Sequence, residues 1–327
     1  MTVPGGLSAE RHRDVILTPA AEAQVNGFRF ILGAHDLQGN ALGGFAHRRR
    51  GHVTGQTPAP RVPEARWTGR HIYAGVLFGQ FGHFVTESLS RLWALAERPG
   101  AALVWHRHPD HRQPGLARWQ EQVLEAAGAA GRTHRIVDAP VLVEDILVPE
   151  QGHILGERHH PALDAVIARH RFHKPLPGRR VWLSRSLLTR EGGSGLVEGE
   201  AELEALLRAE GWEVVHPERL PVPAQLAACE QAEVIAGFAG SAFHLLLLGY
   251  GVRARVVLLD RGLGPELRRN YDVIAAAKGF RQTVLEVPLT LAGGAGHTGH
   301  WRLEDPVAAA ALLRGAAGGL DSGAAAS

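Results

Sequence analysis

The second half of the chain alternates short apolar segments with amphipathic segments of helical length, and this alternation limits the fold more than any other feature. Segments such as RRVWLSR, EVIAGF and ARVVLLDR have apolar cores, and short connections join them to the helical segments between them. Strands that are apolar on both faces belong to a parallel sheet with helices on both sides. The pattern therefore predicts a doubly wound α/β domain.

The first half of the chain has a more mixed pattern. RDVILTP, FRFILGA and RHIYAGVLF have the composition of strands, and an amphipathic helix is expected over FGHFVTESLSRLWAL, which begins at Phe81. The Pro/Gly segment KPLPG marks a domain boundary near Pro175. We expect two stacked α/β domains with a cleft between them, residues 1–174 and 175–316, and a disordered low-complexity tail over 317–327.

The charge balance and the single cysteine exclude several classes of protein. The 327 residues include 35 basic and 33 acidic side chains without a Lys/Arg block, so neither a nucleic-acid surface nor a polybasic membrane anchor is expected. Cys229 stands alone, which excludes an internal disulfide framework and a cysteine-based zinc site. No run of about 18 apolar residues occurs. We expect a cytoplasmic protein and leave peripheral association with the inner face of the membrane, and the oligomeric state, open.

The helix expected from Phe81 onward carries a polar stripe. At about 100° per residue, His83, Glu87 and Arg91 share one side of the helix, and apolar residues occupy the other. Such a stripe fits a solvated face with helix-spaced charge pairs. The alternative is that it faces a cleft, where a carboxylate and a histidine one turn apart could deprotonate a hydroxyl group.

Two strand ends in the second half have the features of a phosphate site. The strand EVIAGF contains Gly237 and leads into a turn and a helix that begins around Gly240–Ser241, with His244 one turn further. A helix start of this kind offers free N–H groups and a positive dipole end to a phosphate. The turn lacks the G-x-G-x-x-G dinucleotide pattern, so an ordinary strand-to-helix turn that needs glycine for close packing is the alternative.

The strand VWLS ends in Ser184 and Arg185, where ligands of open α/β sheets bind. The forked guanidinium suits a phosphate, although a surface arginine at a strand end is equally consistent with the pattern. Arg190 in the following loop is a weaker candidate.

The histidine-rich segment WHRHPDHR does not complete a metal-ligand pattern. His106, His108, Asp110 and His111 crowd a strand end, but neither an H-E-x-x-H motif nor an equivalent zinc spacing is present. With 19 histidines in the chain, clusters arise by chance. We expect no metal site.

The chain resembles glycosyltransferase family 61, a group that contains bacterial capsular-polysaccharide proteins and eukaryotic N-acetylglucosaminyl and xylosyl transferases. In the second half the resemblance rests on Ser184–Arg185, the segment Trp212 to Glu218, Gln225, and the segment Gly237 to Ser241. In the first half, GHFVTESLSRLW resembles a family helix whose His, Glu and Arg fall on His83, Glu87 and Arg91. Two separated blocks in the right order cover about half of the chain.

This resemblance implies the architecture called GT-B, with two Rossmann-like domains facing across a cleft, and an inverting transfer of a sugar from a nucleotide-sugar donor to a glycan or lipid-linked acceptor in polysaccharide biosynthesis. It implies that Glu87 or His83 acts as base, with Glu87 favoured and His83 positioning the acceptor, and that Arg91 lies on the acceptor side. The donor phosphates are expected on a set of second-half residues: Ser184, Arg185, Gly237, Gly240, Ser241 and His244. No cofactor is expected, because the nucleotide-sugar is a substrate and helix dipoles and basic side chains replace a metal ion.

Two departures from the family pattern keep alternatives open. His244 is followed by Leu245 where many members carry Asn, and only Glu200 remains of an Arg-x-x-x-Asn-Glu block. The chain could therefore be a nucleotide-sugar or glycan-binding protein that kept the fold and lost turnover. A sugar-nucleotide epimerase of similar fold is a third interpretation, and the first-half motif argues against it.

Overall fold

The computed structural model describes residues 6–188 and 195–318. The chain forms two compact units, Met1–Arg169 and His170–Ser327, so that the division falls a few residues before the expected boundary near Pro175. Of the tail expected over 317–327, the first two residues belong to the last helix, Pro306–Gly318, and the rest lies outside the described residues. No helix in the described ranges has both the length and the apolar character that crossing a membrane requires.

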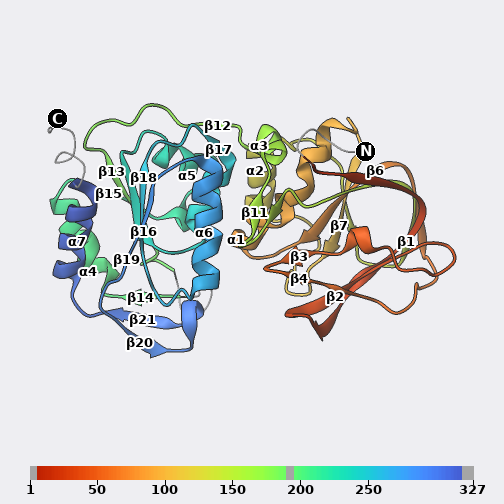
Figure 1. Ribbon diagram of the computed structural model, residues 1–327, viewed down its shortest axis with the longest axis horizontal. Helices are drawn as coiled ribbons and strands as arrows, with labels where there is room; N and C mark the ends of the chain where they lie inside the picture. The colour runs from red at the N-terminus through yellow and green to blue at the C-terminus, as the bar shows by residue number, and fades with distance from the viewer. Residues whose placement is uncertain (1–5, 189–194, 319–327) are drawn as a thin grey trace. The chain divides into compact units, whose positions relative to one another are not determined.

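The second unit contains the parallel α/β sheet that the sequence predicts. Its strand order is β15-β13-β16-β18-β19, and every neighbouring pair is parallel. The strands are β13 (Arg180–Leu183), β15 (Glu213–Val215), β16 (Val234–Phe238), β18 (Arg255–Leu259) and β19 (Gln282–Leu285). Figure 1 shows helices on both faces of this sheet, α4 and α7 on one and α5 and α6 on the other. The helices are α4 (Glu200–Ala209), α5 (Val222–Cys229), α6 (Pro265–Lys278) and α7 (Pro306–Gly318).

Short elements complete this unit. A three-stranded sheet has the order β14-β21-β20, and β12 pairs with β17. The short elements are β12 (His170–Arg171), β14 (Val197–Glu198), η3 (Pro217–Arg219), η4 (Ser241–Leu248), β17 (Gly249–Tyr250), β20 (Leu289–Gly293), η5 (Gly296–Thr298) and β21 (His300–Leu303). The segment expected as an α-helix from Ser241 is thus a 3₁₀ helix.

The order of the strands creates a topological switch point in the second unit. The chain passes from β13 outward to β15, and then crosses back to β16 on the other side of β13. Loops at the carboxyl ends of β13 and β16 therefore diverge, and such a switch point is where open α/β sheets bind ligands.

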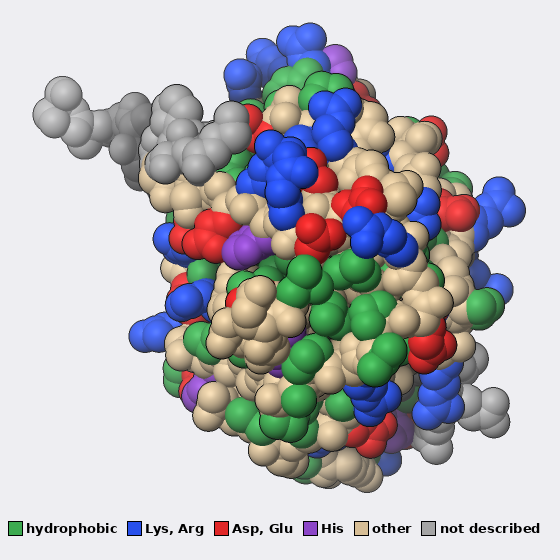
Figure 2. All heavy atoms as spheres, turned by 90° about the vertical axis from the view of Figure 1, so that its right-hand side faces the viewer, with side chains coloured by type: hydrophobic (Ala, Val, Ile, Leu, Met, Phe, Trp, Pro, Cys, Tyr) green, Lys and Arg blue, Asp and Glu red, His purple; other side chains and the backbone are tan. Residues whose placement is uncertain are grey.

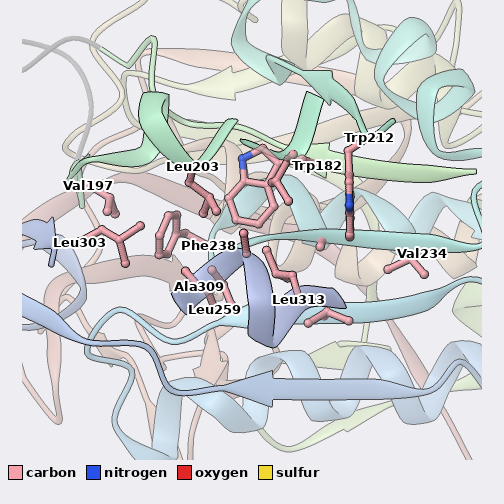
Figure 3. Close-up of a cluster of buried hydrophobic side chains, with 14 residues drawn as sticks. Trp182, Val197, Leu203, Trp212, Val234, Phe238, Leu259, Leu303, Ala309 and Leu313 are labelled. Atoms are coloured by element: carbon pink, nitrogen blue, oxygen red, sulfur yellow. The ribbon is translucent and has the colours of Figure 1, made fainter. Parts of the chain in front are cut away.

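The core between the sheet and α4 and α7 holds this switch point rigid. Trp182 and Phe238, from the two strands that meet there, pack edge to face with ring centroids 5.6 Å apart. Figure 3 shows both rings surrounded by aliphatic side chains of α4 and α7, among them Leu203 and Leu313. Close packing of this kind leaves little freedom to the residues that follow each strand.

The first unit has a seven-stranded mixed sheet of order β5-β2-β1-β9-β6-β7-β8. Strands β9, β6, β7 and β8 are mutually parallel, whereas β1 runs antiparallel to both β2 and β9. The strands are β1 (Ala9–Val25), β2 (Phe28–His35), β5 (Gly55–Gln56), β6 (Ala65–Leu77), β7 (Ala102–Arg107), β8 (His134–Val137) and β9 (Val141–Pro149). This unit is therefore α/β without being parallel throughout, in contrast to the expected Rossmann-like sheet.

A tight turn explains the antiparallel part of that sheet. Asn26 and Gly27 connect β1 to β2, and both have positive φ, 49° and 77°. An Asn-Gly pair with this backbone is the preferred two-residue connection of a β-hairpin. The sequence signal was present in VNGF, and it specifies the hairpin.

The helix expected from Phe81 is broken in two. An α-helix, α1 (Phe81–Thr86), ends at Glu87, and a 3₁₀ helix, η2 (Ser88–Ala96), follows. Since a 3₁₀ helix has about three residues per turn, the expected i, i+4, i+8 stripe does not continue along one face. The other elements of the unit are η1 (Gly43–Phe45), β3 (Arg48–Arg49), β4 (His52–Val53), α2 (Arg118–Ala126), β10 (His153–Ile154), β11 (Arg158–His159) and α3 (Pro161–Ile167).

Candidate functional site

Glu87 lies at the junction of α1 and η2 and is wholly buried, with its side chain 0% exposed. Its Oε1 accepts hydrogen bonds from His47 Nε2 at 2.8 Å and Arg49 Nε at 2.6 Å. Its Oε2 accepts one from Arg49 Nη2 at 2.9 Å and a short one from His83 Nδ1. We call these four residues the Glu87 cluster. Both carboxylate oxygens of Glu87, the residue expected as base, are thus hydrogen-bonded to side chains of the first unit.

The partners of Glu87 fix its protonation state. Burial by itself would raise the pKa of the Glu87 carboxyl, but the positive Arg49 guanidinium and the hydrogen bonds from His83 and His47 hold that pKa well below its usual range. Burial lowers the pKa of His47 despite the neighbouring carboxylate. Arg49 is itself held over the rings of Phe28 and Phe78, each 5.4 Å from the guanidinium carbon. Glu87 is therefore a permanent anion that cannot accept a proton near neutral pH.

His83 is the accessible member of the pair that it forms with Glu87. About a third of its side chain, 34%, is exposed. Because Nδ1 faces Glu87, a proton on Nδ1 leaves Nε2 as the acceptor nitrogen, and no described residue forms a hydrogen bond with Nε2. A buried carboxylate that holds one nitrogen of an imidazole orients the other toward a substrate proton.

Arg91 lies apart from the Glu87 cluster. It is buried, and its guanidinium donates hydrogen bonds to the backbone carbonyls of Pro149 and, at 2.7 Å, Ala46. It also lies over the Tyr73 ring at 5.1 Å. Burial lowers the pKa of Arg91 to about 10, so it stays charged at neutral pH. The expected polar stripe is therefore not a solvated face, because Glu87 and Arg91 are buried in different surroundings and His83 alone of the three is partly exposed.

The histidines of WHRHPDHR have separate structural partners. His106 bonds to the Tyr73 hydroxyl at 2.9 Å, and His111 bonds to Gln120 at 3.2 Å. His108 packs against Phe78, with ring centroids 4.9 Å apart, and burial lowers its pKa to about 4. Within the described ranges, no three His, Cys, Asp or Glu side chains gather in an arrangement that could hold a metal ion.

The second unit brings Arg185 and Gly240 together at the switch point. Arg185 follows β13, Gly240 follows β16, and a Cβ atom on Gly240 would overlap the Nη1 atom of Arg185. The guanidinium therefore lies directly on the Gly240 backbone, a close approach that any side chain at this position would obstruct. Ser241 is exposed at the start of η4, immediately after Gly240.

Other residues expected at the phosphate site have structural roles. Ser184 is buried, and its hydroxyl donates to Glu204 at 2.5 Å and accepts from the Ser186 N–H at 3.0 Å. Gly237 is buried within β16, where a Cβ would lie 2.6 Å from the Leu183 carbonyl. The contacts of both residues shape the ends of β13 and β16. His244 belongs to η4 and is partly buried, with its ring 5.3 Å from that of Tyr271 on α6. Arg190 lies outside the described residues.

Arg261 is a functional candidate that the sequence reasoning missed. It follows β18, is 5% exposed, and donates from Nε to the Ala239 carbonyl at 2.6 Å. Burial and the nearby positive charge of Arg185 lower its pKa to about 9. Its position resembles that of Arg185, since each arginine follows the carboxyl end of a parallel strand. The sequence LLDRG shows this position, with an arginine close after an apolar strand segment.

Glu200 holds the turn that carries Arg185. Its Oε1 accepts hydrogen bonds from the Arg185 N–H at 3.0 Å and the Trp182 indole at 3.2 Å. Burial raises the pKa of this carboxyl to about 8. The one residue kept from the Arg-x-x-x-Asn-Glu block thus supports the strand end from within the core.

A family model described as Glycosyltransferase 61 matches residues 81–250. The match contains both the His83–Glu87 pair and the turns after β13 and β16, so the two candidate regions belong to one enzyme class, the glycosyltransferases. The chain belongs to glycosyltransferase family 61, which confirms the resemblance. Family membership implies that a sugar donor and an acceptor are its substrates. Among curated proteins, none matches the chain.

Proposed function

We propose that the protein transfers a sugar from a nucleotide-sugar to a hydroxyl group of a glycan or lipid-linked acceptor, in polysaccharide biosynthesis and with inversion at the anomeric carbon. The observation that carries the proposal is the contact between His83 Nδ1 and the buried Glu87 carboxylate, which leaves Nε2 on the accessible side of the ring. Transfer requires the acceptor-binding first unit to face the donor-binding second unit across a cleft, as in the GT-B architecture.

In this proposal the donor diphosphate binds at the switch point of the second unit. Arg185 and Arg261 both contact the Ala239–Gly240 turn, and burial lowers the pKa of each. Two guanidinium groups that repel each other in a buried site gain stability when an anion binds between them. The Ser241 hydroxyl and the N–H groups at the start of η4 supply further donors.

The same arginines supply the charge that stabilises the departing diphosphate. Negative charge develops on the phosphate oxygen as its bond to the anomeric carbon breaks, and fixed cations placed there lower the barrier. We therefore propose that transfer proceeds without a metal ion.

The acceptor hydroxyl gives its proton to His83. As the acceptor oxygen attacks the anomeric carbon, the proton moves to His83 Nε2, the bond to the diphosphate breaks, and the nucleoside diphosphate leaves with the bonding electrons. Glu87 keeps its charge, holds Nδ1 and stabilises the imidazolium that forms. His83 is thus the catalytic residue and Glu87 the positioning residue, which reverses the roles expected from the sequence.

A panel of uridine and guanosine diphosphate sugars tests the proposal. Donors that bind are found by thermal shift, because ligands of the native state raise its melting temperature. Release of nucleoside diphosphate is then measured with glycan acceptors, in the presence and absence of chelator. The proposal is supported if the wild type turns over a nucleotide-sugar and His83→Ala does not. Stabilisation by a nucleotide-sugar without turnover on any acceptor would favour the non-catalytic binding protein.

A further inference from the structure

The first unit contains a cavity of about 570 Å³ that none of the roles described above uses. It lies among the start of β1, η1, the β3–β4 hairpin, the end of β9 and the β10–β11 hairpin. Its volume is within the range of about 300–1,000 Å³ that is usual for ligand sites. All of its lining residues belong to the first unit.

The β3 segment contributes side chains both to the cavity and to the Glu87 cluster. His47 and Arg49 direct their side chains to Glu87, whereas Arg48 between them lines the cavity together with its cross-strand partner Val53. None of the four residues of the Glu87 cluster lines the cavity, although His52, the cross-strand partner of Arg49, does. The cavity is therefore a site distinct from the reacting groups.

The charged groups that line the cavity balance one another. Three carboxylates and three guanidinium groups contribute to the lining: Glu10, Glu150, Glu157, Arg48, Arg91 and Arg158. A strongly anionic ligand would meet three carboxylates, and an apolar ligand would remove charged groups from water without replacing their hydrogen bonds. A polyhydroxylated ligand satisfies both kinds of group, since each hydroxyl both donates and accepts. Figure 2 shows the same interspersion of acidic and basic side chains on one outer face of the molecule.

Several of these groups are fixed before any ligand binds. Glu150 accepts a hydrogen bond from the Ser8 N–H at 3.0 Å, and Glu157 accepts one from the Gly51 N–H. Arg91 is 3% exposed and is held by the carbonyls of Ala46 and Pro149, while its buried Nε atom has no partner in the described part of the chain. Pre-positioned polar groups lower the entropy cost of binding a flexible ligand.

We propose that this cavity binds an uncharged saccharide segment of the acceptor, at a distance from the hydroxyl that reacts. The identification of the ligand as the acceptor rests on the proposed function, whereas saccharide binding itself does not require turnover. In this proposal the acceptor-side role expected of Arg91 is exerted from the lining of this cavity.

A substitution that fills the cavity tests the proposal. Gly43 lines the cavity, has no positive φ, and a Cβ at this position would meet nothing within 4 Å, so Gly43→Trp adds an indole at the lining of the cavity without backbone strain. Gly115 has the same properties outside the cavity, and Gly115→Trp is the matched control. Circular dichroism and melting temperature establish that both variants fold.

The measurement is binding of the fluorescently labelled protein to a glycan array that carries uncharged, carboxylated and sulfated saccharides, without donor. We expect the wild type and Gly115→Trp to retain the same uncharged saccharides and Gly43→Trp to bind them at least about tenfold more weakly. Equal retention by Gly43→Trp, retention of sulfated or carboxylated saccharides alone, or retention of nothing by the wild type would each overturn the proposal.

A transfer assay separates this proposal from the proposed function. If the wild type transfers sugar and Gly43→Trp does so with an unchanged acceptor KM, the cavity proposal fails and the transferase stands. If the wild type binds uncharged saccharides and Gly43→Trp does not, but the wild type transfers no sugar, the cavity proposal stands and the proposed function fails.

Discussion

His83 Nδ1 donates a hydrogen bond to Glu87 Oε2 across the last turn of α1, where the α-helix gives way to the 3₁₀ helix η2. The break at Glu87 places the carboxylate in the interior while the imidazole stays at the surface. The two residues therefore have different tasks, although they lie four positions apart, and substitutions should separate these tasks.

Replacement of His83 by Ala should lower turnover by about 10²–10⁴, the usual contribution of a positioned base. The nucleoside diphosphate affinity should not change, because the donor site is proposed to lie in the other unit. Rates under saturating donor and diphosphate titrations check both statements. The control is His173→Ala, which removes a half-exposed histidine of the second unit that is paired with Glu230. Turnover of His83→Ala at the wild-type rate would show that His83 is not the base.

Replacement of Glu87 by Gln should lower the free energy of unfolding of the first unit. It leaves the partly buried Arg49 guanidinium without its anion, and because Arg49 is 22% exposed the cost should be below the about 3–5 kcal/mol of a fully buried ion pair. Urea unfolding, or hydrogen exchange of peptides from α1 and β3, measures the change. Because the folded pKa of Glu87 is depressed, its stabilising effect is present above the unfolded pKa, about 4.3, and is lost as the pH falls through the folded value. The variant should therefore lose part of the acid dependence that the wild type shows below about pH 4.

Glu200 should give the opposite dependence on pH. Its folded pKa of about 8 lies above its ordinary value of 4.5, so its effect on stability is fully present below the ordinary value and is lost as the pH rises toward 8. The loss can reach about 1.4 kcal/mol per pH unit within that window. Glu200→Gln keeps an oxygen for Trp182 and the Arg185 N–H but cannot ionise, so the second unit should unfold with a flatter pH profile. Glu202→Gln, an exposed change on the same helix, is the control. Identical slopes for the two variants would show that Glu200 is not the titrating group.

Loss of Arg185 or of Arg261 should each weaken nucleoside diphosphate binding. A charge-assisted hydrogen bond contributes about 1.5–3 kcal/mol, so the alanine variants should bind about ten- to a hundredfold more weakly in isothermal titration. Arg253→Ala, an exposed arginine of the same unit, should bind like the wild type. If Arg261→Ala matches that control while Arg185→Ala does not, Arg261 takes no part in the site.

Gly237→Ala and Gly240→Ala should differ in what they damage. A Cβ at Gly237 would lie 2.6 Å from the Leu183 backbone carbonyl, so alanine there should lower the melting temperature of the second unit. A Cβ at Gly240 would displace only the end of the flexible Arg185 side chain, so alanine there should spare the melting temperature and weaken diphosphate binding. Melting curves with and without diphosphate distinguish the two effects. Equal melting temperatures and equal ligand shifts for both variants would contradict the assignment.

The second unit was largely predictable from the sequence because its determinants are local. Strands apolar on both faces alternate with helical segments, and the carboxyl ends of neighbouring parallel strands necessarily meet at one edge. Arg185 and Gly240 are brought together by that rule alone. Arg261 obeys the same rule, since it follows β18, but the sequence reasoning considered only Asp260 at this strand end.

The Glu87 cluster could not be predicted in the same way. His47 and Arg49 lie about forty positions before Glu87 and reach it through tertiary packing, which no local period records. An amphipathic pattern identifies a buried face but does not show when an element is buried on every side, as η2 is. From the sequence, the polar stripe is therefore expected on a solvated face or facing a cleft. In the structure, the hydrogen-bond partners of Glu87 and Arg91 lie in the interior of the first unit.

The pairing of β1 with β9 sets an order of events during synthesis. Ala9 pairs with Pro149 and Leu17 with Val141, so one side of β1 cannot be completed until most of the first unit has left the ribosome. The Asn26–Gly27 turn lets β1 and β2 form a hairpin long before that. Contacts between distant residues form slowly, and an unpaired strand edge recruits other chains. Once the hairpin has formed, only the β9-facing edge of β1 stays unpaired. The nascent chain is therefore most prone to aggregate in the interval between formation of the hairpin and synthesis of β9.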